Sequence, residues 1–130
     1  MRIDGFLRCH ARRCKRDGEH RLQVVCVEWF RLLYPAHALL LVAVPNGGRR
    51  DAVTGARLKE EGVTAGVSDL VLFCPKGGWH GLLIEMKTVG GRQSAAQKQW
   101  QQAVEQMGYY YVICRSRQDF ERVVTEYMNG

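Results

Sequence analysis

Two short apolar runs near the middle of the chain predict neighbouring β-strands. They cover residues 69–73 (Asp-Leu-Val-Leu-Phe) and 82–87 (Leu-Leu-Ile-Glu-Met-Lys), and each is almost continuously apolar. Such runs are typical of strands that are buried on both faces of a sheet. Because strand side chains alternate, we expect Glu85 and Lys87 on one face and the intervening apolar side chains on the other.

Apolar residues at helical spacing predict amphipathic helices in three further segments. The first spans residues 19–34, the second follows Ser94 and the third follows Ser116. Ser94 and Gln97 have the spacing of a capping box, and Ser116 has the position of an N-cap. The positions expected to face the core are Leu22, Val25, Cys26, Trp29, Phe30 and Leu33 in the first helix, Ala96, Trp100, Ala103, Val104 and Met107 in the second, and Phe120, Val123, Val124 and Tyr127 in the third.

The remaining segments complete an α/β pattern. Residues 39–44 and 109–114 predict two more strands, residues 54–61 predict a short helix, and residues 75–78 predict a hairpin turn. The order α, β, short α, β, β, α, β, α is typical of an α/β fold with a mixed sheet. A chain of 130 residues is long enough for one domain. We expect that domain to span residues 19–130, after a basic leader of residues 1–18.

The charge distribution favours a polyanionic partner, because the net charge is +6 and the pI is about 9.3. The leader is especially basic and contains Arg2, Arg8, Arg12, Arg13, Lys15 and Arg16. It is either a solvated tail or an arm that follows phosphates. No apolar stretch is long enough to span a bilayer and the leader lacks the apolar block of a secretory signal, so we expect a cytoplasmic protein.

The cysteines and histidines do not predict a metal site. Five cysteines is an odd number, which disfavours a disulfide framework, and Cys26, Cys74 and Cys114 lie at expected core positions. The candidate zinc ligands have spacing unlike that of a regular zinc finger or ribbon. These candidates are Cys9, His10, Cys14 and His20. Phosphate-binding glycine loops are also missing from the sequence, so no nucleotide cofactor is expected.

Asp69, Glu85 and Lys87 are the strongest candidates for chemistry. Two carboxylates at adjacent strand ends can bind Mg²⁺ through oxygen, and a neighbouring lysine can neutralise charge that develops on a phosphate. A structural ion pair is the alternative, although it would have to be desolvated inside the sheet. Glu19 lies at the N-terminal edge of the core-facing side of the first helix. It either favours the positive end of the helix dipole or reaches the sheet as a ligand of a metal or water.

Several ordered motifs together resemble the stand-alone virus-type replication-repair nuclease (VRR-NUC) domains of the PD-(D/E)XK nuclease superfamily, which have a restriction-endonuclease-like core. The motifs are Glu-His-Arg-Leu-Gln at 19–23, Pro-Asn-Gly-Gly-Arg at 45–49, Leu-Lys-Glu-Glu-Gly at 58–62, Gly-Val-Ser-Asp-Leu at 66–70, Ile-Glu-Met-Lys at 84–87, Ser-Ala-Ala-Gln at 94–97 and Gly-Tyr at 108–109. Ser68 stands where the family usually has a proline. That proline shapes the backbone and is not a ligand.

The resemblance implies a catalytic centre that uses Mg²⁺ or Mn²⁺. Asp69 and Glu85 would bind the metal together with the backbone carbonyl of Met86, and Glu19 would complete the site directly or through water. Lys87 would be the catalytic lysine. Gln97 would be the active-site glutamine in addition to its capping role.

The resemblance also implies contacts to the DNA backbone from Asn46, Arg49 and Lys59, to which we add Arg92 in the basic loop and Arg12 and Arg13 in the leader. We expect a homodimeric endonuclease of a bacterial or phage-infected cell that cuts branched DNA, as Holliday-junction (four-way junction) resolvases do. A flap or linear-duplex nuclease is the nearest alternative. A non-catalytic nucleic-acid-binding module with the same fold is an alternative of another class. A basic adaptor whose N-terminal cysteines hold zinc is a third alternative.

Overall fold

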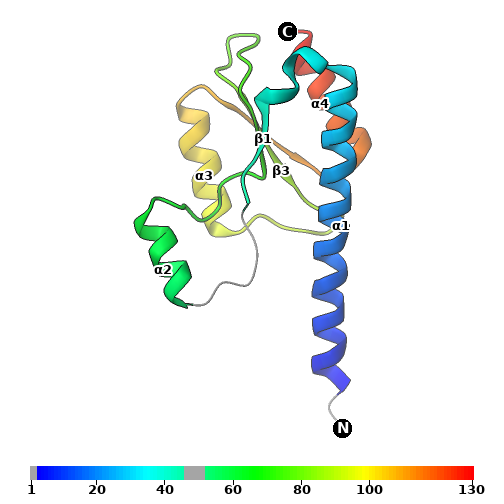
Figure 1. The fold of residues 1–130 in the computed structure, drawn as a ribbon, viewed down its shortest axis with the longest axis vertical. Coiled ribbons are helices and arrows are strands. Elements are labelled where there is room, and N and C mark those ends of the chain that lie inside the picture. Colours follow the sequence, from blue (N-terminus) through cyan, green and yellow to red (C-terminus); the bar gives the residue numbers. More distant parts are fainter. Residues whose placement is uncertain (1–2, 46–51) are drawn as a thin grey trace.

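A mixed β-sheet lies at the centre of the computed structural model, which describes the backbone of residues 3–45 and 52–130 and the side chains of residues 18–45 and 52–130. In this part of the chain the sheet has four strands, side by side in chain order (Figure 1). They are β1 (Leu41–Ala43), β2 (Leu70–Leu72), β3 (Leu82–Met86) and β4 (Tyr110–Cys114). The pairs β1–β2 and β2–β3 are antiparallel and β3–β4 is parallel, which confirms the predicted mixed sheet.

Helices cover both faces of this sheet (Figure 1). The helices of the described chain are α1 (Ile3–Leu33), α2 (Ala52–Glu60), α3 (Ala95–Gln106) and α4 (Arg117–Met128), together with the 3-10 helix η1 (Pro35–Leu40). Of these, α2 has no buried residue and lies away from the sheet (Figure 1). α1 and α4 pack on one face and α3 packs on the other, while the N-terminal half of α1 extends beyond the sheet. The predicted caps are present, since Ser94 and Ser116 accept hydrogen bonds from the first turns of α3 and α4.

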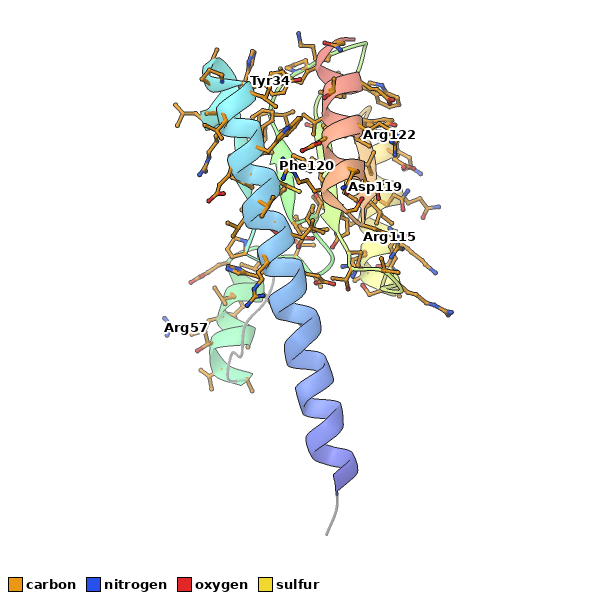
Figure 2. All side chains as sticks on the ribbon, turned by 90° about the vertical axis from the view of Figure 1, so that its right-hand side faces the viewer. Tyr34, Arg57, Arg115, Asp119, Phe120 and Arg122 are labelled. Atoms are coloured by element: carbon orange, nitrogen blue, oxygen red, sulfur yellow. The ribbon has the colours of Figure 1, made fainter. Side chains whose placement is uncertain are left out.

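The larger part of the core lies between the sheet and the pair α1 and α4. Leu82, Ile84 and Met86 of β3 point into it, as strand alternation predicts. Phe120 of α4 is fully buried and lies between α1 and α4 (Figure 2). Its ring packs edge to face with that of Trp29, and the ring centroids are 5.9 Å apart. The other buried members are Cys26, Phe30, Leu41, Leu70, Leu72, Cys74, Cys114, Val123, Val124, Tyr127 and Met128, so the three cysteines predicted to be core residues are confirmed.

A smaller cluster lies between the sheet and α3. Its buried members are Val71, Leu83, Val104 and Tyr111. The rest of the predicted α3 stripe packs less fully, because Trp100 and Ala96 are half-buried while Ala103 and Met107 are exposed. This thinner layer leaves polar side chains of α3 close to the sheet, on the face that carries Glu85.

The first helix differs from its prediction in length and in its buried stripe. It begins at Ile3, not at Glu19, so the helix continues through the predicted leader. Of the expected core positions, Cys26 and Phe30 are fully buried, whereas Val25 and Leu33 are 38% and 55% exposed. The contact with the sheet and α4 is therefore a narrow strip along one side of α1, and the flanking apolar residues remain outside it.

The first strand is shorter than predicted. Leu39 and Leu40 belong to η1, which begins at Pro35, and β1 starts only at Leu41. A proline in the first turn favours a helical start because its fixed φ suits the helix and its missing N–H is not needed there. The apolar run therefore divides between a 3-10 helix and an edge strand.

Gly66 brings the segment before β2 against the start of α3. It has φ +85°, and a Cβ there would lie 2.7 Å from the backbone N of Gln97 and closer still to the carbonyl group of Ala96. Both features favour glycine, because L-residues are strained at this φ and the neighbouring atoms are backbone.

We predict that Gly66→Ala lowers the free energy of unfolding by about 2–4 kcal/mol, through backbone strain and overpacking against α3. Chemical denaturation measures the change. Gly55→Ala is the matched control, since a Cβ at Gly55 in α2 meets nothing within 4 Å and should be neutral or mildly stabilising. Equal stabilities for the two variants would contradict the close approach of Gly66 to α3.

Candidate active site

Two carboxylates face each other at one end of the β2–β3 pair. Leu70 pairs with Ile84 in an antiparallel register, so Asp69 comes directly opposite Glu85 on the same face of the sheet. The Oδ2 atom of Asp69 accepts a hydrogen bond of 2.7 Å from the backbone N–H of Met86. This bond fixes the Asp69 carboxylate beside the end of β3.

Glu85 is almost completely removed from solvent, with 2% of its surface exposed. Its Oε1 accepts a hydrogen bond of 3.0 Å from Nε2 of Gln97. Its Oε2 is buried and has no hydrogen-bond partner among the described residues. Burial, followed by the neighbouring Asp69 carboxylate, raises the pKa of Glu85 from 4.5 to about 8, although the positive charge of Lys87 acts in the opposite direction. A proton or a cation is therefore needed beside this carboxyl group at neutral pH.

Gln97 connects the helix cap to the acids. The side-chain Oε1 of Gln97 accepts a hydrogen bond of 2.8 Å from the backbone N–H of Ser94. The backbone N–H of Gln97 donates one of 3.1 Å to Oγ of Ser94. Because the amide oxygen is held by the cap, the amide nitrogen is directed at Glu85. The predicted capping box is thus confirmed, and the same side chain also reaches Glu85.

All five of the predicted catalytic side chains line one cavity of about 200 Å³. The full lining is Glu19, Gly66, Val67, Asp69, Glu85, Lys87, Ser94 and Gln97. Glu19 comes from α1, and its charge contributes to the raised pKa of Glu85. Residues from α1, the segment before β2, β3 and α3 therefore meet at this point.

The acids present fit a cation that needs few protein ligands. Among the described side chains, no three histidine, cysteine or acidic residues come close enough together to hold a metal ion, so Glu19 does not form a compact triad with Asp69 and Glu85. Mg²⁺ keeps several of its waters and is usually held by one or two carboxylates. The facing acids and the unpartnered Oε2 of Glu85 suit such an ion.

The loop after β3 is held by a residue that the sequence analysis missed. Nη1 of Arg115 donates to the carbonyl oxygens of Thr88 and Gly91, at 3.2 and 2.6 Å. Arg115 lies just before α4 (Figure 2), and the stem of Lys87 passes close to Gly91. Arg115 therefore helps to fix the chain that follows Lys87. Its sequence neighbourhood carries no signal for this, because its partners are backbone atoms more than twenty positions away.

The structure describes the side chains of only two of the predicted DNA-binding residues. Lys59 on α2 and Arg92 in the loop before α3 are exposed and are not among the residues that line the cavity in the described structure. Asn46 and Arg49 lie outside the described residues. The side chains of Arg12 and Arg13 do so as well, together with those of the candidate zinc ligands Cys9, His10 and Cys14, whereas His20 is exposed on α1.

Comparison with known proteins gives the site its context. The family model of the VRR-NUC domain matches residues 17–118. The chain belongs to the VRR-NUC domain family. A solved structure named a VRR_NUC domain protein is similar to it with a TM-score of 0.75 and 25% identity, over 85% of this chain and 88% of the other. No curated protein matches the chain.

This membership makes the chain a nuclease domain with an α/β fold, and nucleic acid is its substrate. Every helix within the described ranges is too short or too polar to cross a membrane.

The raised pKa of Glu85 predicts a pH-dependent stability of the metal-free VRR-NUC domain. Between its ordinary pKa of 4.5 and its folded pKa of about 8, the unfolded chain releases this proton and the folded domain keeps it. This contribution to stability is therefore present below pH 4.5 and is lost as the pH rises through 8.

Glu85→Gln cannot ionise and should therefore escape this loss, so its melting temperature should exceed that of the wild type increasingly as the pH rises toward 8. Thermal unfolding in EDTA from pH 5 to 9 measures the difference. Glu126→Gln, which changes an exposed acid on α4, should instead follow the wild-type curve. Parallel curves for wild type and Glu85→Gln would contradict the raised pKa.

Proposed function

We propose that this VRR-NUC domain is a metal-dependent, structure-specific DNA endonuclease that hydrolyses phosphodiester bonds at four-way junctions, in the cytoplasm of a bacterial or phage-infected cell. The observation that carries the proposal is the convergence of Asp69, Glu85 and Lys87 on one cavity, with Gln97 bonded to Glu85. A buried Glu85 that faces a half-buried Asp69 is costly unless the two acids hold a cation, and this cost supports a metal-binding role for the pair.

The residues proposed to hold Mg²⁺ or Mn²⁺ are Asp69, Glu85 and the backbone carbonyl of Met86, with Glu19 acting through a water. When bound, such an ion supplies charge neutralisation at the phosphate and lowers the pKa of an attacking water. Glu19 fits an indirect role because it lines the cavity without joining a compact cluster of acids.

The protein's own groups divide the remaining work. Met86 fixes Asp69 through its N–H, and Gln97 fixes Glu85 through its amide. Lys87 lines the same cavity, and its ammonium group is proposed to neutralise the negative charge that develops on the phosphate during hydrolysis. These contacts hold the acids in place before the substrate arrives, which reduces the reorganisation needed in the transition state.

Contacts to the DNA backbone are proposed for the basic residues around the site. Lys59 and Arg92 are exposed, as this role requires. Asn46 and Arg49 are proposed from the family motif, and the basic stretch that contains Arg12 and Arg13 is proposed to follow phosphates. Such contacts position the duplex without reading its sequence.

A homodimer is proposed because two symmetric active sites can cut opposed strands of a symmetric junction. The surface proposed for it is the edge of β1, which has β2 on one side and no other described strand on the other. Around this edge Leu39 and Val42 are 93% and 41% exposed. Pairing of β1 with its own copy about a twofold axis would cover the open edge and these apolar side chains.

The first test is cleavage of a labelled four-way junction beside 5′-flap and linear-duplex controls, with Mg²⁺, Mn²⁺ or EDTA. We expect paired symmetric cuts at the junction that disappear with EDTA. Glu85→Ala should reduce cleavage to background while DNA binding stays within about twofold, because the acid faces a metal and not the bases. Glu126→Ala should cleave as the wild type does.

The other outcomes separate the alternatives. Cutting of flaps or plain duplex would keep the nuclease and reject the junction preference. Unpaired single cuts at the junction would argue against the dimer. Intact substrate under every metal condition would favour a nucleic-acid-binding module that has kept the fold.

The proposed role of the leader predicts a change in salt dependence. Replacing both Arg12 and Arg13 by glutamine should weaken junction binding and reduce the slope of log K against log salt by about 2, since two phosphate contacts are lost. Fluorescence anisotropy at several salt concentrations measures the slope. Arg122→Gln on α4, where the side chain is exposed, is the control. An unchanged slope would indicate that the leader is a solvated tail.

A further inference from the structure

Tyr111 places a buried hydroxyl group on the same face of the sheet as Glu85. It lies in β4 opposite Leu83, two positions before Glu85 in the adjacent parallel strand. Only 7% of its surface is exposed, and it packs with Leu83, Val71 and Val104 beneath α3. A phenylalanine would satisfy this apolar packing. The hydroxyl group therefore needs an explanation, because burying one is costly unless it forms hydrogen bonds.

The Tyr111 oxygen is held as an acceptor. Nε2 of Gln93, in the loop before α3, donates to it at 3.2 Å and to Oε1 of Gln101 at 2.8 Å. Gln101 in turn donates to Glu105 at 2.9 Å. This run of side chains fixes the amide of Gln93 with its nitrogen toward the tyrosine. The oxygen of Tyr111 is thereby occupied as an acceptor, and its proton is free to point toward a different group.

The available acceptor is Glu85. Its Oε1 is taken by Gln97, whereas its Oε2 is buried without a partner among the described residues. Burial raises the pKa of Tyr111 to about 12, and the charges of Glu85 and Asp69 act on it in the same direction. The hydroxyl thus stays protonated and lies within the field of the two acids. The Tyr111 hydroxyl, a hydrogen-bond donor, and Oε2 of Glu85, an acceptor without a partner among the described residues, therefore lie in the same buried region of the sheet.

We propose that Tyr111 is a positioning residue for Glu85. Its hydroxyl, oriented by Gln93, donates to Oε2 of the ionised carboxylate and holds it from the side opposite Gln97. A carboxylate oxygen has room for this bond beside a metal ion, and ligating carboxylates are commonly held by such outer partners. The inference rests on the proposed function, since it assigns Glu85 to a metal.

The test is metal binding without DNA. Tyr111→Phe keeps the ring and removes only the hydroxyl, and we expect its Mn²⁺ dissociation constant, measured by calorimetry, to rise about tenfold or more. Gln93→Ala should give a smaller rise, because the hydroxyl remains but loses its orienting partner. Tyr110→Phe is the matched control, since the Tyr110 ring lies against Trp79 and Tyr127 on the opposite side of β4. It should bind Mn²⁺ as the wild type does.

Two further readouts separate positioning from loss of structure. The melting temperature of metal-free Tyr111→Phe should stay close to that of the wild type, and raising the Mn²⁺ concentration should restore most of its cleavage rate. If Tyr111→Phe fails to fold, Gln93→Ala in the loop decides the question.

A wild-type dissociation constant for Tyr111→Phe, or for Gln93→Ala where it decides, would overturn the inference. Loss of cleavage that excess metal does not restore would also overturn it. If the wild type binds no Mn²⁺, or if Glu85→Gln binds Mn²⁺ as the wild type does, the metal site itself would be overturned. Failure of the proposed metal site and failure of the role of Tyr111 are therefore distinguishable.

Discussion

The burial of the Glu85 carboxyl group beside Asp69 is the constraint to which the rest of the domain responds. An acid that is 2% exposed on an interior strand has lost its water, and a second acid opposite it makes ionisation harder still. Such a pair persists only where the fold supplies donors or a cation. The Met86 N–H and the Gln97 amide supply two of these donors, and Lys87 supplies a nearby positive charge.

The two faces of the sheet divide stability from chemistry. The face toward α1 and α4 carries most of the apolar core, with Phe30 and Phe120 fully buried. The face toward α3 carries a smaller apolar cluster and then gives way to polar side chains at the end where the acids lie. Strand alternation makes this division possible, because β3 sends Ile84 to one face and Glu85 to the other. A rigid core directly behind the site keeps the acids in register.

Supports for the site come from segments that are distant in sequence. Gln97 depends on the cap of α3, and that cap is positioned by the close approach of Gly66. Arg115, which directly follows the C-terminal end of β4, holds the loop after Lys87. The parallel pairing of β3 and β4 brings Tyr111 beside β3 and Arg115 beside the segment that follows β3, because it places the same ends of both strands together. A change in any of these contacts would move the acids without touching them.

The sequence by itself determined the types of the elements, the mixed α/β order, the alternation of Glu85 and Met86 and the cap at Ser94, because these depend on spacing within a few residues. The motif from Glu19 to Gln97 also indicated which side chains line one cavity. Only the tertiary structure decided the short β1, the exposed Val25 and Leu33 on α1, and the contacts of Arg115 and Tyr111. Each of these depends on distances between segments far apart in the chain, and side-chain periodicity carries no information about such distances.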